Sequence, residues 1–118
     1  MGRALAGLRL TSDVLRAAYA YLEETEPFRS WNLPDAEDVR FVVSRGKGVQ
    51  GWAVLHKKEI AISSACVGCT RVLMEIMAHE MVHMHVDRHG DASPHGPHFL
   101  KAAKKVCAIH GFDYKSFI

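Results

Sequence analysis

Several features are scarce in this sequence of 118 residues, and each absence excludes a class of protein. No run of about 18 apolar residues is present, so we expect no membrane-spanning helix. Neither sign of charge dominates, because 15 basic residues face 13 acidic ones, and charge alone gives no reason to expect a nucleic-acid partner. Cysteine occurs only three times, an odd number that argues against a disulfide framework.

The first residues lack the features of a secretory signal. Residues 1–8 contain one arginine and a short apolar patch, and Arg9 interrupts the patch before a useful apolar length develops. With the few cysteines, this predicts a cytoplasmic protein in a reducing compartment. We expect residues 1–10 to form a loose lead-in. The composition, 48% hydrophobic and 24% charged, is typical of a folded core, and the length predicts a single domain over residues 1–118.

Hydrophobic periodicity predicts both helices and strands. Apolar residues at helical spacing predict a first helix over 12–24, a long helix over 70–89 and a last helix from about Phe99 to His110. β-branched and aromatic runs predict three strands, over 39–45, 52–56 and 59–63. We expect the strands to form a mainly antiparallel meander with helices on one face. The fold class predicted is therefore a small α+β domain.

Cys66 and Cys69 form a C-x-x-C pair just before the long helix. Such a pair can be half of a zinc site or a redox couple. No second C-x-x-C is present, Cys107 alone cannot complete a four-ligand set, and the βαβ context of a redox pair is missing. The favoured interpretation is a tight turn between strand and helix, without chemistry.

The long helix contains His79-Glu80-Met81-Val82-His83, an H-E-x-x-H pattern. Residues four apart lie on the same face of a helix, so His79 and His83 can direct two imidazoles at one zinc ion. Glu80 is offset by about 60° from His83 around the helix axis, so it can reach a metal-bound water without binding the metal. This is the zincin arrangement of two histidine ligands and a glutamate general base.

A catalytic zinc site needs a third protein ligand, and several residues are candidates. His89 has the metzincin spacing, but Val86 stands where that pattern needs glycine, and a straight helix carries His89 roughly 15 Å from His79. His85 points to another side of the helix. Asp87 is better placed to accept a hydrogen bond from an imidazole N–H.

His95 is the strongest candidate for the third ligand. Residues 90–94 break the helical pattern and let the chain reverse, so His95 stands at the start of a helix that can pack antiparallel to the first. His98 in the same segment is its rival.

The pattern His79-Glu80-Met81-Val82-His83 followed by His95-Gly96-Pro97-His98-Phe99 resembles the SprT-like (Spartan) zinc metalloprotease domain. That family carries H-E-x-x-H and then H-G-x-x-F, and the likeness covers roughly residues 10–110. It implies a zincin-like fold with His79, His83 and His95 as Zn²⁺ ligands, Glu80 as the base and Phe99 in the core. The implied function is peptide hydrolysis by a zinc-bound water, in better-known members on proteins bound or crosslinked to DNA.

Two departures from the family's pattern are present, and the second leaves DNA binding through a zinc-ribbon module unsupported. His98 stands where an acidic residue is common, and no zinc ribbon follows in this sequence. Lys101, Lys104 and Lys105 can contact phosphates, but a solvated helix face is the favoured interpretation. We expect a protein or peptide substrate, paired as an added strand along residues 59–63.

The alternative function is a non-catalytic, zinc-stabilised interaction module. In that case His98 or Asp87 would provide a fourth ligand and close the site. His98, His85 and Tyr114 are only weak candidates for the oxyanion stabiliser of an enzyme, and the sequence indicates no substrate identity or oligomeric state.

Overall fold

The computed structural model describes residues 10–46, 48–65 and 70–118. Its helices are α1 (Ser12–Glu23), α2 (Thr70–Val86), α3 (Pro97–His110) and the one-turn α4 (Tyr114–Phe117), and its strands are β1 (Arg40–Ser44), β2 (Gly51–Val54) and β3 (Glu59–Ser63). The α+β class is confirmed. The predictions for Cys66, Cys69 and the lead-in of residues 1–9 lie outside the described residues.

The three strands form a mixed sheet in the order β1-β3-β2. β2 runs antiparallel to β3, with Trp52 opposite Ala61, whereas β1 runs parallel to β3, with Phe41 opposite Ile60. The predicted meander in chain order is therefore wrong. β3 takes the centre because Ile60, Ala61 and Ile62 are all fully buried, as a strand paired on both sides requires. As a consequence, β2 lies at an edge.

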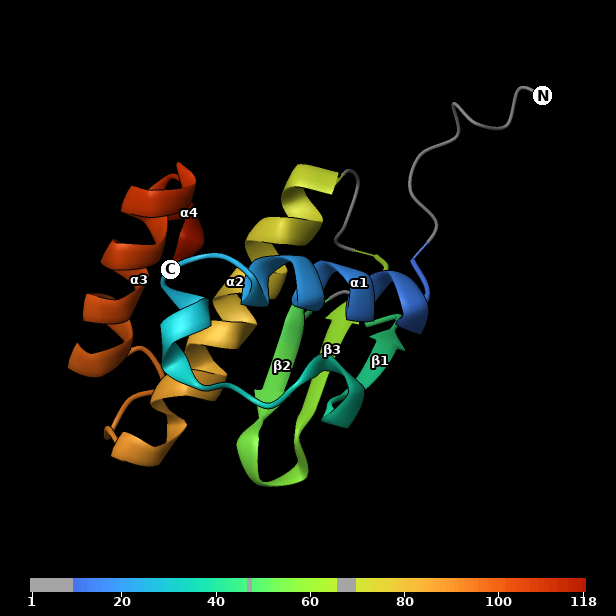
Figure 1. Ribbon diagram of the computed structural model, residues 1–118, viewed down its shortest axis with the longest axis horizontal. Coiled ribbons are helices and arrows are strands. Elements are labelled where there is room, and N and C mark those ends of the chain that lie inside the picture. Colours follow the sequence, from blue (N-terminus) through green and yellow to red (C-terminus); the bar gives the residue numbers. More distant parts are fainter. Residues whose placement is uncertain (1–9, 47, 66–69) are drawn as a thin grey trace.

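The core lies between one face of the sheet and helices α1 and α2. Ile60 and Ile62 of β3, Tyr19 of α1 and Met77 and Met81 of α2 are completely buried there. The methionines of α2 therefore belong to the core, as the apolar stripe predicted. α3 packs against α2, and in Figure 1 it lies with α4 on the side of α2 away from the sheet.

The helix ends follow the local signals in the sequence. The Thr11 hydroxyl accepts a hydrogen bond from the backbone N–H of Val14, at 3.1 Å, and caps α1. α2 ends at Val86, and residues Asp87–His89 form a 3₁₀ turn (η5) instead of the last helical turn we expected. Gly90, with φ of 66°, then adopts the left-handed conformation that lets the chain turn toward α3.

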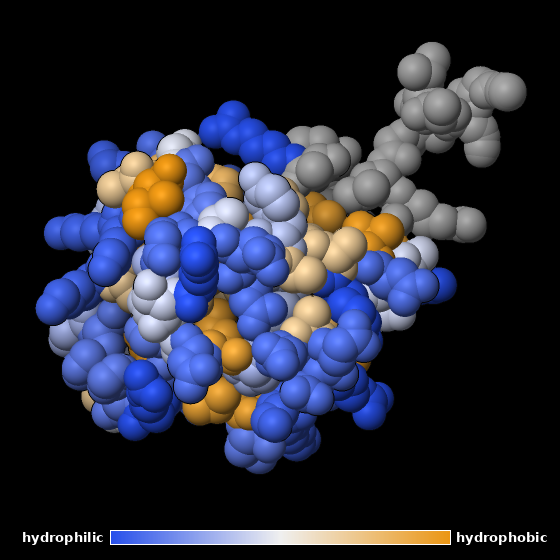
Figure 2. Space-filling view, viewed as in Figure 1, coloured by the Kyte–Doolittle hydropathy of each residue, from blue (hydrophilic) through white to orange (hydrophobic). Residues whose placement is uncertain are grey.

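The surface agrees with this placement of the core. On the face shown in Figure 2 the residues are mainly hydrophilic, and apolar residues form small separate groups. Among the described residues, no helix is both long and apolar enough to cross a bilayer.

A buried hydroxyl fastens α1 to the loop before the sheet. Tyr19 has no exposed surface, and its hydroxyl donates a hydrogen bond to the carbonyl oxygen of Pro34 at 2.5 Å. Burial raises the pKa of Tyr19, so the phenol stays protonated as a donor. The same loop buries Phe28 and Leu33.

Tyr19→Phe should lower the free energy of unfolding by about 1–2 kcal/mol, because it removes the donor of the Pro34 carbonyl and keeps the ring. Urea denaturation measures the change. Tyr21→Phe in the same helix is the matched control, because Tyr21 is 61% exposed and should change stability by less than about 0.5 kcal/mol. Equal losses in the two variants would contradict this role for Tyr19.

Candidate functional site

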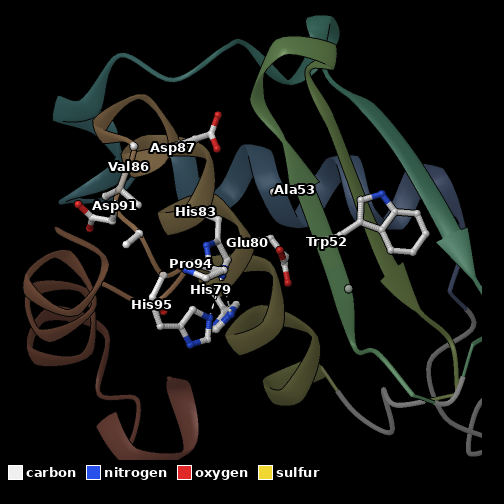
Figure 3. Close-up of a pocket in the computed structure, with 14 residues that line it drawn as sticks. Trp52, Ala53, His79, Glu80, His83, Val86, Asp87, Asp91, Pro94 and His95 are labelled. Carbon is white, nitrogen blue, oxygen red and sulfur yellow. Dashed lines mark hydrogen bonds between the residues drawn. The ribbon is translucent and has the colours of Figure 1, made fainter. Parts of the chain in front are cut away.

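A cleft lies between strand β2, helix α2 and the segment that follows α2 (Figure 3). It consists of two hollows of about 530 and 540 Å³, which share Gly51, His79, Glu80 and His95 in their walls. Residues 90–95 border the first hollow, and residues 116–118 border the second. His79 and Glu80 of the H-E-x-x-H motif therefore lie where the two hollows adjoin.

Three histidines converge in this cleft. His79 and His83 point from successive turns of α2, and His95 reaches them from the segment before α3 (Figure 3). Nε2 of His83 lies 3.2 Å from Nε2 of His79 and 3.1 Å from Nε2 of His95. Imidazoles that bind one tetrahedral ion at 2.0–2.1 Å have their nitrogens about 3.3 Å apart. The three side chains therefore have the spacing of a metal site.

The ring of Phe99 packs against all three rings of this histidine cluster. Its centroid lies 5.1 Å from that of His79, 4.5 Å from that of His83 and 4.3 Å from that of His95. Phe99 has no exposed surface, as expected from the resemblance. A single buried side chain thus contacts all three imidazoles and helps to hold their orientation.

Asp91 holds the segment that presents His95. Its carboxylate accepts hydrogen bonds from the backbone N–H of His98 at 3.1 Å and from Nδ1 of His98 at 2.7 Å. A Cβ at position 96 would lie 2.8 Å from the Asp91 side chain, so the turn needs glycine there. The hydrogen bond from His98 holds the pKa of Asp91 below its ordinary value.

The structure turns the rival histidines away from the cluster. His98 is held by Asp91, and its ring stacks on that of His89 with centroids 4.0 Å apart. His85 stacks on Trp31 at 3.8 Å. His85 and His98 border a different hollow, so neither is placed to stabilise an oxyanion in the cleft.

Burial favours the neutral form of two of the clustered imidazoles, His79 and His83. It lowers the pKa of His79, and it lowers that of His83 to about 4, with repulsion from His79 and His95 as smaller causes. A metal ion binds the neutral imidazole, so protons compete weakly for these ligands.

A backbone atom that the sequence analysis missed holds His79. Nδ1 of His79 donates a hydrogen bond to the carbonyl oxygen of Phe117, at 2.6 Å. Asp87, which we expected to accept such a bond, makes none with the three imidazoles in the described part of the chain. A backbone carbonyl group has no signal of its own in a sequence, so this contact was not predictable.

Glu80 is buried beside the cluster, with 5% of its surface exposed. Burial raises its pKa to about 8, although a cation held by the three histidines would lower it again. The side chain points toward β2 (Figure 3).

Gly51 is a second residue that sequence reasoning missed, because glycine has no side chain by which to recognise a functional position. A Cβ at position 51 would lie 2.5 Å from the Ala61 carbonyl oxygen and 3.3 Å from Oε2 of Glu80. Only glycine lets β2 pass this close to both β3 and the glutamate.

Two histidines of one helix, a third from beyond a chain reversal and an adjacent buried glutamate form a site that can bind a metal ion, an arrangement typical of metallopeptidase-type domains. Residues 17–116 match the SprT-like family, and the chain belongs to that family. The resemblance seen in the sequence is therefore confirmed. A search of curated proteins finds no match to the chain.

We expect one divalent metal ion per chain, and His95→Ala should lower this content strongly because two imidazoles alone bind weakly. Elemental analysis after gel filtration measures the ratio. His89→Ala is the matched control and should keep the metal, since its ring stacks on His98 outside the cluster. Loss of metal in His89→Ala with retention in His95→Ala would refute the assignment of the third ligand.

Proposed function

We propose that this protein is a zinc-dependent metallopeptidase that hydrolyses peptide bonds. The observation that carries the proposal is the convergence of His79, His83 and His95 beside the buried Glu80. Three imidazoles that converge on one point favour zinc among the common divalent ions. Among the described residues the cluster contains no fourth ligand, which supports an open site and disfavours the closed, purely structural one.

Each side chain has a distinct task in this proposal. Zinc held by the three imidazoles would polarise the scissile carbonyl and make a water molecule more acidic. Glu80 takes the proton of the attacking water and later donates it to the leaving amine. Its buried position favours proton uptake, and the space left by Gly51 gives its carboxylate access to the cleft.

Strand β2 has the free backbone groups that an extended substrate needs. The N–H of Ser63 donates to the carbonyl of Gln50, so these two residues form a hydrogen-bonded pair of the antiparallel ladder. Pairs alternate along such a ladder, so Gly51 and Ala53 direct their N–H and C=O groups away from β3. Both residues border the cleft, where a peptide can add as a further strand.

We expected the substrate to pair with strand Glu59–Ser63 (β3), and this prediction is wrong. β3 is the central strand of the sheet, and both of its edges are already paired, with β1 and with β2. The role passes to its neighbour β2.

DNA-associated substrates are a further expectation from the family resemblance. Lys101, Lys104 and Lys105 lie exposed on α3 and would supply phosphate contacts. The test of this expectation is to measure DNA affinity at several salt concentrations. Contacts to phosphates would make the affinity fall steeply as the salt concentration rises.

Glu80→Gln should retain the metal and lower peptide hydrolysis by at least about 100-fold, because the amide cannot accept the water's proton. A quenched fluorescent peptide or an unfolded protein substrate measures the rate, and elemental analysis measures the metal. Glu24→Gln, an exposed site at the end of α1, is the control. Hydrolysis at the wild-type rate by Glu80→Gln would end the proposed mechanism.

Ala53→Pro should lower kcat/KM about 3- to 10-fold, mainly through KM, because it removes one outward N–H that pairs with substrate. The β2–β3 ladder and metal content should be unaffected, since that N–H makes no bond to β3. Ala53→Ser keeps the N–H and is the control. An unchanged KM in the proline variant would show that the substrate does not pair with β2.

A further inference from the structure

We propose that helix α4 is a positioning element of the metal site, which presents the Phe117 carbonyl to His79 and so fixes the ring nitrogen that faces the metal. The inference rests on the metal site of the proposed function, but it does not depend on peptide hydrolysis. It assigns a role to the last residues of this sequence, which lie far along the chain from the H-E-x-x-H motif.

The hydrogen bond selects one tautomer of His79. A carbonyl oxygen only accepts, so Nδ1 of His79 must carry the hydrogen of the bond to Phe117. In a neutral imidazole Nε2 then keeps its lone pair, and Nε2 is the atom that faces His83. Without the carbonyl, the ring would be free to take the other tautomer or to rotate. Partners of this kind are typically worth 10- to 100-fold in metal affinity.

Two features hold the carbonyl in place. The Phe117 side chain is 2% exposed, and its ring lies 5.5 Å from that of His79 and 5.7 Å from that of Phe112. The Asp113 carboxylate caps α4 by accepting hydrogen bonds from the backbone N–H and the hydroxyl of Ser116, each at 3.0 Å. The anchor and the cap both lie outside the three-histidine cluster.

The same turn also forms part of the cleft. Ser116, Phe117 and Ile118 border the second hollow, beside Val49 of the segment before β2. A single docked element therefore orients a ligand and shapes one side of the substrate path. Undocking α4 would change both at once.

Thermodynamic linkage makes the coupling reciprocal. If docked α4 favours metal binding, then bound metal must favour docked α4 by the same factor. The N–H groups of Phe117 and Ile118 bond to the carbonyls of Asp113 and Tyr114, so their hydrogen exchange reports on the docking of α4.

The test uses the full chain and Zn²⁺ in competition with a chromogenic chelator. Asp113→Ala should weaken zinc binding about 5-fold, because loss of the cap favours the undocked turn. Phe117→Ala should weaken it about 10-fold or more. Asp113→Asn, which can still cap, should restore nearly wild-type affinity, and Lys115→Ala, an exposed position of α4, should leave it unchanged.

A second readout separates positioning from general stability. In the metal-free protein, ¹⁵N NMR of His79 should show hydrogen on Nδ1 in the wild type and a tautomer mixture in Asp113→Ala. Hydrogen exchange at Phe117 and Ile118 should slow when zinc is added. A variant that is only less stable would change neither the tautomer nor zinc affinity well below its melting temperature.

The outcomes are distinct for the two proposals. If the wild type binds no zinc, the proposed function fails together with this inference. If the wild type and both Asp113→Ala and Phe117→Ala bind zinc equally tightly and all show the same His79 tautomer, α4 has no positioning role and the proposed function stands.

Discussion

The candidate site depends on one geometric requirement, that the nitrogens of three imidazole rings meet at a single point. A regular helix places two of the three nitrogens, because residues four apart lie on the same face. His79 and His83 therefore need only that α2 is straight. The third nitrogen requires the chain to reverse within a few residues. The left-handed Gly90, the Asp91 carboxylate and the close approach at Gly96 all serve this reversal. The H-G-x-x-F motif is therefore a packing requirement as well as a ligand signal, since Gly96 admits Asp91 and Phe99 supports the rings.

The order of the strands has a chemical consequence. Because β3 occupies the centre of the sheet, the edge that passes over α2 belongs to β2. Gly51 brings this edge within contact distance of the Glu80 carboxylate. The buried Glu80 side chain on α2 thus faces strand β2, as Figure 3 shows, and the outer edge of β2 is not paired with another strand in the described part of the chain. In a meander in chain order, β2 would be paired on both sides and the strand beside Glu80 would have no free edge.

Sequence patterns predicted the features that interactions between nearby residues determine, such as the positions of the helices. Periodicity located α1, α2 and α3 to within a few residues, and the break at residues 90–94 singled out His95 from the other histidines. Strand order was not predictable in this way, because the parallel pairing of β1 with β3 joins residues about 20 positions apart with no turn signal. The Phe117 carbonyl and the Gly51 contact were missed because a backbone acceptor and an absent side chain have no residue-type signature.

The contacts within the histidine cluster compete for one hydrogen. If Nδ1 of His79 carries its hydrogen, Nε2 of that ring directs a lone pair at Nε2 of His83, which also lies 3.1 Å from Nε2 of His95. A single proton on His83 can bond to only one neighbour at a time, and burial and mutual repulsion oppose a second proton. A metal ion with an acceptor position for each lone pair removes this conflict. The packing around Phe99 and α4 therefore holds the three rings in an arrangement that a bound metal ion would stabilise.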